Sequence, residues 1–294
     1  MIIVKISGGL GNQLFQYSFG KYLSVTLNTN IKFDIQTKYK IKGFSQRLFG
    51  LNNLNLNIEI ASNYDIKKFK CFFKNEFLIR LERKLVQIFP SINKSFIVQI
   101  SNEYQKNIMR IRDNCYYDGY WQSEQYFKPI GSKIRDEFEL KLKLNTLNTA
   151  LLNKIINSES ISIHIRRGDY ISIKNNSKVF LICPVEYYIK AINFFINKLK
   201  NPKFYIFSDD HIWAKSNFLG EQFCFIEGNS KYPEIDMFLM SKCHHNIIAN
   251  STFSWWGAWF NSNPDKIVVA PGNWYKGRFN DSINDLILPD WILL

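Results

Sequence analysis

The sequence lacks the cysteine and histidine patterns on which disulfide-linked and metal-built folds depend. Its five cysteines are odd in number and include no CxxC pair, which argues against a disulfide framework and a zinc site. The four histidines form no HExxH motif, so we expect no bound metal. Unpaired cysteines fit a reducing cytoplasm.

Long apolar runs are absent too. No stretch approaches the length of a membrane-spanning helix, and the apolar run at the N-terminus is broken at Ser7 by glycines, unlike a secretory signal. We therefore expect a cytoplasmic protein. The chain has no internal repeat and no low-complexity linker, and its 294 residues suit two domains of about 150 residues.

Acidic residues are scarce relative to basic ones. The chain has 38 Lys and Arg against 25 Asp and Glu, a net charge of +13. A basic surface favours anionic partners, such as the phosphates of a nucleotide sugar, nucleic acid or anionic lipid. Because no zinc finger, RNP pattern or long basic arm occurs, we expect no nucleic-acid binding.

The most informative motif follows a short buried strand. Residues 160–163 alternate Ser and Ile, as in a half-buried or buried strand, and lead to His164, Arg166, Arg167 and Asp169. Strand tips are where open α/β sheets bind ligands, and guanidinium groups match phosphate oxygens. The motif predicts a phosphate or diphosphate site. A surface salt-bridge cluster around Asp169 is the alternative.

A second motif lies where another strand, residues 246–249, becomes a helix. Ser251, Thr252 and Ser254 supply three hydroxyl groups at this junction, which is typical of helix N-caps. A helix N-terminus also favours an anion, so the motif predicts a second part of the phosphate site. The alternative is that these residues only cap a helix whose aromatic face is core.

The chain opens on a predicted βαβ unit. Strands are expected at residues 2–6 and 31–34, with a glycine-rich turn and a helix from Leu14 to about Leu27 between them. Gly9 and Gly11 imitate the start of a dinucleotide-binding fingerprint, but its third glycine is missing. A tight turn explains the glycines. It does not explain the amides of Asn12 and Gln13 at the helix start.

Further along, the pattern changes between the two halves. Residues 65–89 repeat Phe or Leu every four residues among basic side chains, which predicts one amphipathic helix. A core-facing helix is favoured there over a membrane-surface helix. The second half alternates expected strands (161–165, 203–207, 222–225, 246–249, 267–270) with helices (185–199, 212–218, 234–242, 253–260), which predicts a parallel sheet covered on both faces.

Together these stretches resemble the α-1,2-fucosyltransferases of bacteria, glycosyltransferase family 11. The resemblance covers most of the chain, in the family's order, through five segments: Gly8–Gln16, Gly119–Glu124, His164–Tyr170, Phe207–Asp210 and Asn250–Gly257. It implies an α/β fold of the GT-B type, with two Rossmann-like domains facing each other across a cleft. Residues 1–157 would be the acceptor-side domain and residues 158–294 the GDP-fucose-binding domain.

The resemblance also implies a reaction. A galactoside 2-α-L-fucosyltransferase moves L-fucose from GDP-β-L-fucose, with inversion, to the 2-hydroxyl of a terminal galactose in a surface glycan or O-antigen-type oligosaccharide. It implies no cofactor and no metal, because GDP-fucose is a co-substrate. A lipid-linked acceptor would bring the protein to the inner face of the cytoplasmic membrane, as a peripheral contact with anionic lipid.

Residue roles follow from the matched motifs. The implied catalytic residues are Arg166, directed at the diphosphate, with Asp169 and Asn12. The implied donor-binding residues are His164, Arg166, Arg167, Asp236, Ser251, Thr252, Phe253, Ser254, Gly9, Gly11 and Asn12. The acceptor side would include Gln13, Trp121, Gln122 and Trp255.

Inversion also requires a base that removes the acceptor hydroxyl proton. Asp169 is the first candidate, followed by Glu186 and Asp34. Two other functions stay open: an NAD-dependent oxidoreductase, suggested by the glycine-rich start and Asp34, and a glycan- or nucleotide-sugar-binding protein without turnover. The missing third glycine counts against the first, and Arg166 with the 251–254 segment counts against the second.

Overall fold

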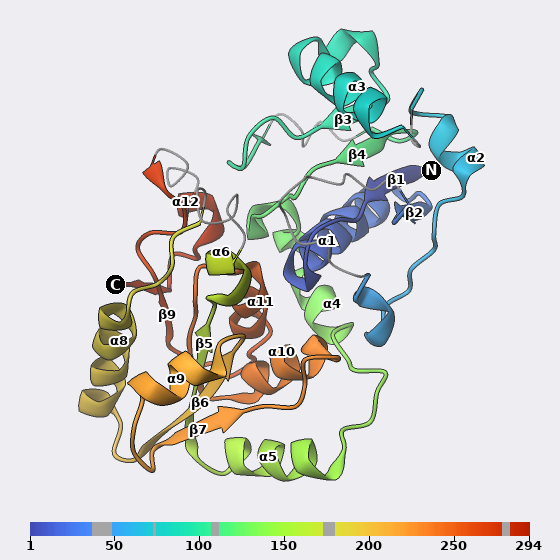
Figure 1. Ribbon diagram of the computed structural model, residues 1–294. Coiled ribbons are helices and arrows are strands. Elements are labelled where there is room, and N and C mark those ends of the chain that lie inside the picture. Colours follow the sequence, from blue (N-terminus) through green and yellow to red (C-terminus); the bar gives the residue numbers. More distant parts are fainter. Residues whose placement is uncertain (37–48, 73–74, 107–111, 173–179, 278–282) are drawn as a thin grey trace. The chain divides into compact units, whose positions relative to one another are not determined.

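The computed structural model describes residues 1–36, 49–72, 75–106, 112–172, 180–277 and 283–294. The described chain divides into two compact units, a first unit up to residue 139 and a second unit from residue 140 (Figure 1). Each unit has its own parallel sheet and its own hydrophobic core.

The first unit is built on a four-stranded parallel sheet with strand order β2-β1-β4-β3. Its strands are β1 (Ile2–Lys5), β2 (Ile31–Asp34), β3 (Phe96–Val98) and β4 (Tyr116–Asp118). Its helices are α1 (Leu10–Leu27), α2 (Asn63–Lys67), α3 (Glu76–Ile88) and α4 (Gly131–Asp136). The predicted βαβ start is confirmed, because α1 joins the parallel strands β1 and β2.

Helix α1 begins earlier than the sequence predicted. Gly9, in an extended conformation, is the N-cap, and the helix starts at Leu10 rather than Leu14. Asn12 and Gln13 therefore lie in the first helical turn, and Gly11 is buried beside them. The glycine-rich stretch is part of the helix start, and Gly8, just before the cap, has a positive φ of 80°, which favours glycine.

A tightly packed turn follows β4. Trp121 has a positive φ of 55°, which is rare for a bulky residue, yet its side chain is fully buried and stacks on Phe19 at 4.3 Å between ring centroids. Gly119 makes this turn possible, since a Cβ there would lie 2.6 Å from the Cβ of Gln99 and 2.7 Å from the Trp121 ring. The packing around Phe19 thus stabilises an otherwise strained backbone.

The single helix predicted over residues 65–89 is instead two helices, α2 and α3. The side chain of Asn75 accepts a hydrogen bond from the N–H of Leu78 and so starts α3. The buried carboxylate of Glu82 accepts from the N–H groups of Cys71 (2.8 Å) and Phe72 (3.2 Å). These bonds satisfy the backbone of the intervening turn, which is why the helix does not continue through it.

Helix α3 does face the core, as favoured, but with other residues than the repeat predicted. It buries Ile79, Glu82 and Val86, and Val86 packs against β3, whereas Leu81 and Leu85, from the four-residue repeat, are exposed. The repeat predicted a core face because apolar spacing alone cannot show which of two faces meets the sheet.

The second unit is built on a six-stranded parallel sheet with strand order β10-β9-β8-β5-β6-β7. Its strands are β5 (Glu159–Ile165), β6 (Pro202–Ser208), β7 (Phe223–Ile226), β8 (His245–Ile247), β9 (Val268–Ala270) and β10 (Ile292–Leu293). Its helices are α5 (Thr146–Ile156), α6 (Gly168–Ser172), α8 (Val185–Lys198), α9 (His211–Asn217), α10 (Pro233–Lys242), α11 (Thr252–Trp259) and α12 (Ile283–Leu286).

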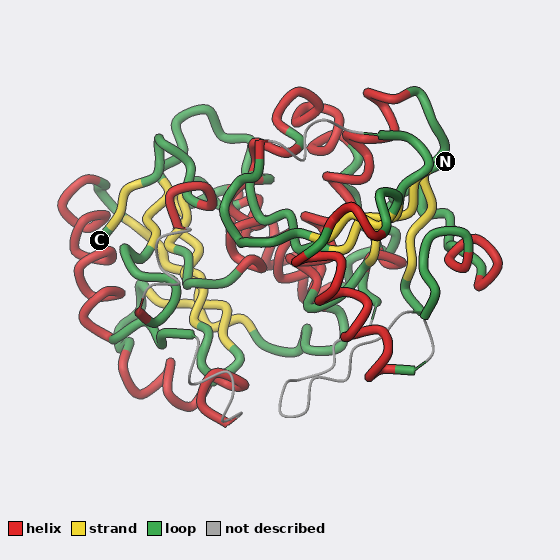
Figure 2. The backbone as a smooth tube through the Cα atoms, turned by 90° about the horizontal axis from the view of Figure 1, so that it is seen from above, coloured by secondary structure: helices red, strands yellow, loops and turns green. Residues whose placement is uncertain are grey.

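Helices cover both faces of this sheet, as predicted, and Figure 2 shows its strands lying between helices. Along β6, Phe204 and Ile206 pack into one core with α8, while Tyr205 and Phe207 pack into the other with α10. Side chains alternate between the faces because the strand repeats every two residues.

Helix α5 belongs to the second unit. Its Ile155, Leu151 and Leu152 pack with Leu239 of α10, so the division of the chain falls before this helix. The sequence placed the division after residue 157, because a helix that ends at a linker carries no local signal for the unit on which it packs. Among the described residues, no helix has the length and apolarity needed to cross a membrane.

Candidate active site

The second sheet has a topological switch point between β5 and β8. The chain runs from β5 to β6 and β7 on one side, and from β8 to β9 and β10 on the other. The carboxyl ends of strands at such a point form the usual ligand crevice of an open α/β sheet. The two motifs singled out in the sequence follow these two strands.

A buried hydrogen bond joins the two motifs. Nδ1 of His164, at the end of β5, lies 2.9 Å from the hydroxyl oxygen of Ser254 in α11. Burial, assisted by the nearby positive charge of Arg166, lowers the pKa of His164 to about 3, although Asp209 opposes the shift. The imidazole is therefore neutral at physiological pH. The ring of Phe253 also lies beside it, at 5.4 Å between ring centroids.

The guanidinium of Arg166 is held between two carboxylates. One terminal nitrogen lies 2.5 Å from Oδ1 of Asp169, and the other lies 2.7 Å from Oδ2 of Asp209. Oδ1 of Asp209 accepts hydrogen bonds from the backbone N–H groups of Arg167 (2.8 Å) and Gly168 (3.1 Å). Asp209 thus fixes both the side chain of Arg166 and the backbone turn that carries it.

Sequence reasoning missed this role of Asp209, which entered only as part of the segment Phe207–Asp210. The parallel register pairs Ile165 of β5 with Ser208 of β6, so the next residues, Arg166 and Asp209, leave adjacent strands at the same edge. The sequence does contain a relevant pattern, because a cation, Arg166, follows β5 and an acid, Asp209, follows β6. Their proximity can be inferred only when these two strands are known to be neighbours.

The guanidinium of Arg167 is held by Asp210 and Trp213. Its Nε lies 3.1 Å from Oδ2 of Asp210, and its guanidinium lies over the ring of Trp213 at 4.1 Å. Asp210 is also the N-cap of α9, accepting from the N–H of Trp213. Asp169 pairs with Arg166, while the ion pair and the stacking on Trp213 hold Arg167 at the start of α9.

The N-terminus of α11 is the third component of the site. Ser251 is its N-cap and accepts from the N–H of Phe253 (3.3 Å). Thr252 and Phe253 are partly exposed in the first turn, whereas Ser254 is buried. The predicted cap is confirmed, and the first turn of this helix presents the partial positive charge that favours an anion.

Asn250 immediately precedes this helix and organises the loops around it. Its side-chain amide donates to the carbonyl oxygens of Leu181 (2.7 Å) and Trp274 (2.8 Å), and its own carbonyl oxygen accepts from the hydroxyl of Tyr170 (3.0 Å). Asn250 thereby joins the segments that surround the ends of β5 and β8.

Asp236 lies in the first turn of α10, a helix that packs against α11. Its Oδ1 accepts a hydrogen bond from Asn229 at 2.8 Å. Burial raises the pKa of Asp236 to about 6, with a contribution from the negative charge of Glu234 and an opposing one from Asn229. The carboxylate is therefore mostly, but not completely, ionised at neutral pH.

In the first unit, two of the predicted site residues contact each other near the carboxyl ends of the adjacent strands β1 and β4. The side-chain amide of Gln122, which follows β4, donates to Oδ1 of Asn12, which follows β1, at 2.8 Å. Gln13 behaves differently. Its amide donates to the carbonyl of Gly8 (2.9 Å), its oxygen accepts from the N–H of Gly50 (2.9 Å), and it is 2% exposed. The side chain of Gln13 thus hydrogen-bonds the backbone of two glycines, Gly8 and Gly50, and is not presented to a ligand.

The whole chain, residues 1–294, matches the family model described as glycosyl transferase family 11. The protein belongs to glycosyltransferase family 11. An α-1,2-colitosyltransferase of Escherichia coli is 35% identical over 285 residues, covering 94% of this chain and 93% of the relative. The E. coli O-antigen biosynthesis glycosyltransferase WbnK is 33% identical over 314 residues, covering 98% and 99%.

Solved structures support the fold of this family member. The crystal structure of the α-1,6-fucosyltransferase NodZ soaked with GDP-fucose, a protein known from Bradyrhizobium, aligns with a TM-score of 0.51 at 13% identity. The alignment covers 90% of this chain and 96% of NodZ. The predicted fold class, α/β of the GT-B type with two Rossmann-like units, is confirmed.

Two tryptophans of the family motifs do not fit the acceptor-side role predicted for them. Trp255 is fully buried, donates its indole N–H to the carbonyl of Leu286 at 2.6 Å and stacks with Trp259. Trp121 is fully buried in the first unit. Contact with a sugar requires an exposed ring face, which neither side chain has, so both belong to the cores of their units.

The three candidates for the general base differ in how exposed their carboxylates are. Asp34 is fully buried and accepts a hydrogen bond from the hydroxyl of Tyr116 at 2.6 Å, so an acceptor hydroxyl cannot reach it. Glu186 is exposed in the first turn of α8. Asp169 is partly exposed beside Arg166, and it is the candidate that lies in the cluster at the end of β5.

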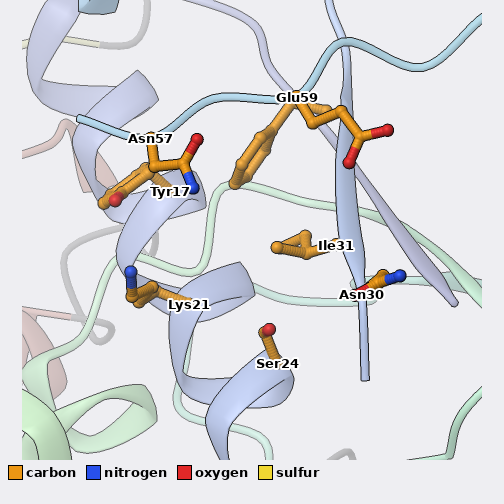
Figure 3. A pocket seen from close by; sticks show the side chains of 8 residues that line it. Tyr17, Lys21, Ser24, Asn30, Ile31, Asn57 and Glu59 are labelled. Atoms are coloured by element: carbon orange, nitrogen blue, oxygen red, sulfur yellow. The ribbon is translucent and has the colours of Figure 1, made fainter. Parts of the chain in front are cut away.

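The first unit also contains a polar pocket apart from these strand ends (Figure 3). It is lined by Tyr17, Lys21, Ser24, Asn30, Ile31, Phe33, Asn57 and Glu59. Asn30 and Ile31 mark the beginning of β2, whereas Asn12 and Gln122 follow the ends of β1 and β4. The pocket therefore lies toward the opposite edge of the sheet from this amide pair.

Proposed function

We propose that this family 11 enzyme transfers L-fucose from GDP-β-L-fucose to the 2-hydroxyl of a terminal galactose, with inversion at C1 and without a metal. The observation that carries the proposal is the guanidinium of Arg166, held between two carboxylates at the end of β5. This strand is joined to the first turns of α11 by the hydrogen bond between His164 and Ser254, at the switch point of the second sheet. A diphosphate leaving group gains negative charge as the glycosidic bond breaks, so its stabilisation is the main catalytic task.

Arg166 stabilises the leaving group through the position of its guanidinium more than through the net charge of the cluster around it. Its cluster holds two arginines against three aspartates, Asp169, Asp209 and Asp210, so the site does not attract anions by excess positive charge. A guanidinium fixed by two carboxylates needs little reorganisation to meet a diphosphate. The N–H groups at the start of α11 contact the remaining phosphate oxygens.

Asp169 acts as the general base in this proposal. In the structure its carboxylate is paired with Arg166. When the donor diphosphate takes over one side of the guanidinium, Asp169 is released to accept the proton of the acceptor hydroxyl. Asn12, held by Gln122, orients the fucose or the acceptor. His164 and Asp236 serve the nucleoside, with the carboxylate accepting from the guanine N1–H and 2-amino groups.

The acceptor we propose is a galactose-terminated oligosaccharide of the O-antigen type, including lipid-linked forms. The name of WbnK, an O-antigen biosynthesis glycosyltransferase, supports this class. Such an acceptor is handled on the cytoplasmic side of the membrane that carries it. We therefore propose a cytoplasmic protein in peripheral contact with the inner face of that membrane.

A second donor is favoured by one specific observation. The relative that is 35% identical is named an α-1,2-colitosyltransferase, and colitose is L-fucose without its 3-hydroxyl group. The same diphosphate grip serves GDP-colitose equally well, because the two donors differ only in the sugar. Parallel assays with both donors decide between them through the ratio of their kcat/KM values.

The proposal is tested by GDP release from GDP-fucose in the presence of EDTA, with and without lactose. Release that rises with lactose, together with a fucosylated lactose, supports a metal-independent transferase acting on galactosides. Slow release that lactose does not change keeps the donor and removes lactose as an acceptor. No release, and no protection against thermal unfolding by GDP, contradicts the donor assignment.

A further inference from the structure

Helix α3 carries a row of apolar side chains on its outer face. Phe77, Leu81, Leu85 and Ile88 are 72%, 44%, 41% and 56% exposed, and their spacing places them within one arc of the helix. The row continues after the helix with Phe89 and Ile92, which are also exposed. We call these six residues the α3 stripe. Contiguous exposed apolar surface of this kind marks an interaction site.

The opposite face of α3 is firmly attached to the first unit. Ile79 and Val86 are buried, and Val86 packs with Phe96 and Val98 of β3. Arg83 also reaches Asp118 at the end of β4, with its Nε 3.5 Å from the carboxylate. The helix therefore cannot turn its stripe inward without losing its own core contacts.

Cations accompany the stripe. Arg80 and Lys84 are exposed and lie four residues apart on α3, along one side of the stripe. Arg80 lies 3.9 Å from Glu76 on the previous turn, and both side chains are well exposed. The surface thus combines apolar anchors with two exposed cations.

We propose that the α3 stripe binds a membrane surface containing anionic lipid, with its apolar side chains in the interface and Arg80 and Lys84 at the headgroups. A helix that lies in the interface has this combination of one apolar face with flanking Lys and Arg. A neutral apolar partner would leave the cations without a complement. Membrane binding is argued from α3 alone. Only its purpose, access to a lipid-linked acceptor, rests on the proposed function.

The test is flotation of the full chain with phosphatidylcholine vesicles, with and without phosphatidylglycerol, at low and high salt. We expect at least about tenfold more binding to the vesicles that contain phosphatidylglycerol, reduced by salt because exposed charges are screened. Leu81→Asn/Leu85→Asn and Arg80→Glu/Lys84→Glu should each lose most of this binding. These side chains are exposed, so the variants should fold.

A matched control is available on α8 in the second unit. Ile189 and Ile196 are 44% and 45% exposed on that helix, close to the values for Leu81 and Leu85. Ile189→Asn/Ile196→Asn should retain vesicle binding. Transfer to soluble lactose should be unchanged in all three double variants, so loss of vesicle binding is separated from failure of the proposed activity.

Two results would overturn the proposal. One is equal binding of wild type and both α3 variants to anionic vesicles. The other is a dimer of the wild type, measured by sedimentation, that Leu81→Asn/Leu85→Asn makes monomeric while vesicle binding is absent. That result would assign the stripe to a second copy of the chain.

Discussion

Removal of the Arg166 guanidinium should separate catalysis from folding. The side chains of Arg166, Asp169 and Asp209 are 21%, 15% and 26% exposed. In Arg166→Ala, water can therefore rehydrate both carboxylates. Screening at this exposure limits the loss of unfolding free energy to about 1–2 kcal/mol, which lowers the melting temperature by about 2–8 °C.

The effect on the reaction should be much larger. A guanidinium about 4 Å from a developing negative charge contributes about 4 kcal/mol at an effective dielectric constant of about 20. That corresponds to about a thousandfold in kcat. Because Asp169 and Asp209 already neutralise part of this charge, we expect a decrease of at least about a hundredfold.

The assay is transfer to lactose under saturating donor, paired with thermal unfolding of the same samples. Arg167→Ala is the matched control, since Arg167 is also ion-paired, with Asp210, but serves the start of α9. It should lose similar stability and far less kcat. A kcat for Arg166→Ala within about tenfold of wild type, or equal losses for the two variants, would refute the role given to Arg166.

Three further predictions follow from single contacts. Asp209→Asn keeps an oxygen for the backbone N–H groups but loses the charge that orients Arg166, so kcat should fall about tenfold without weaker GDP binding; a matching loss of GDP affinity contradicts the positioning role. Asp236, with its pKa raised to about 6, must be ionised to accept from guanine. The affinity for GDP-fucose, whose esterified diphosphate does not titrate near pH 6, should therefore fall in calorimetry as pH drops through 6. Asp236→Asn should weaken GDP-fucose binding at pH above 6 and abolish this pH dependence; an unchanged profile excludes Asp236 from the guanine site. Gly119→Ala should cost about 1–3 kcal/mol in chemical denaturation because the added methyl overlaps its neighbours; an unaltered midpoint would mean that the turn relaxes freely.

Local sequence patterns predicted most of the fold. The apolar runs of β5 and β6 and the helices between them were recognisable because a parallel sheet buries its strands on both faces. The sequence predicted that His164 and Ser254 belong to two motifs that each follow a strand. It did not predict that the two side chains contact each other. The hydrogen bond between them depends on β5 and β8 being neighbours, which the sequence does not state.

Other features required the structure because they depend on which face is buried. Trp121 and Trp255 were assigned to the acceptor side from their motifs, yet tertiary packing places both rings in cores. The period of Leu81 and Leu85 identified an amphipathic helix, but the buried face of α3 contains Glu82 in place of a third apolar residue. The carboxylate there is satisfied by the backbone of Cys71 and Phe72, a long-range pairing with no local signature.

The hydrogen bond between Glu82 and the backbone of Cys71 holds a natural site for a spectroscopic label next to α3. All five cysteines lie within the described residues, and Cys71 alone is exposed. Burial raises the pKa values of Cys183, to about 11, and of Cys115, Cys224 and Cys243, so these thiols react slowly. A polarity-sensitive fluorophore on Cys71 would therefore be carried at a fixed place beside α3. Its emission would report the approach of that helix to a bilayer in real time, without an engineered residue.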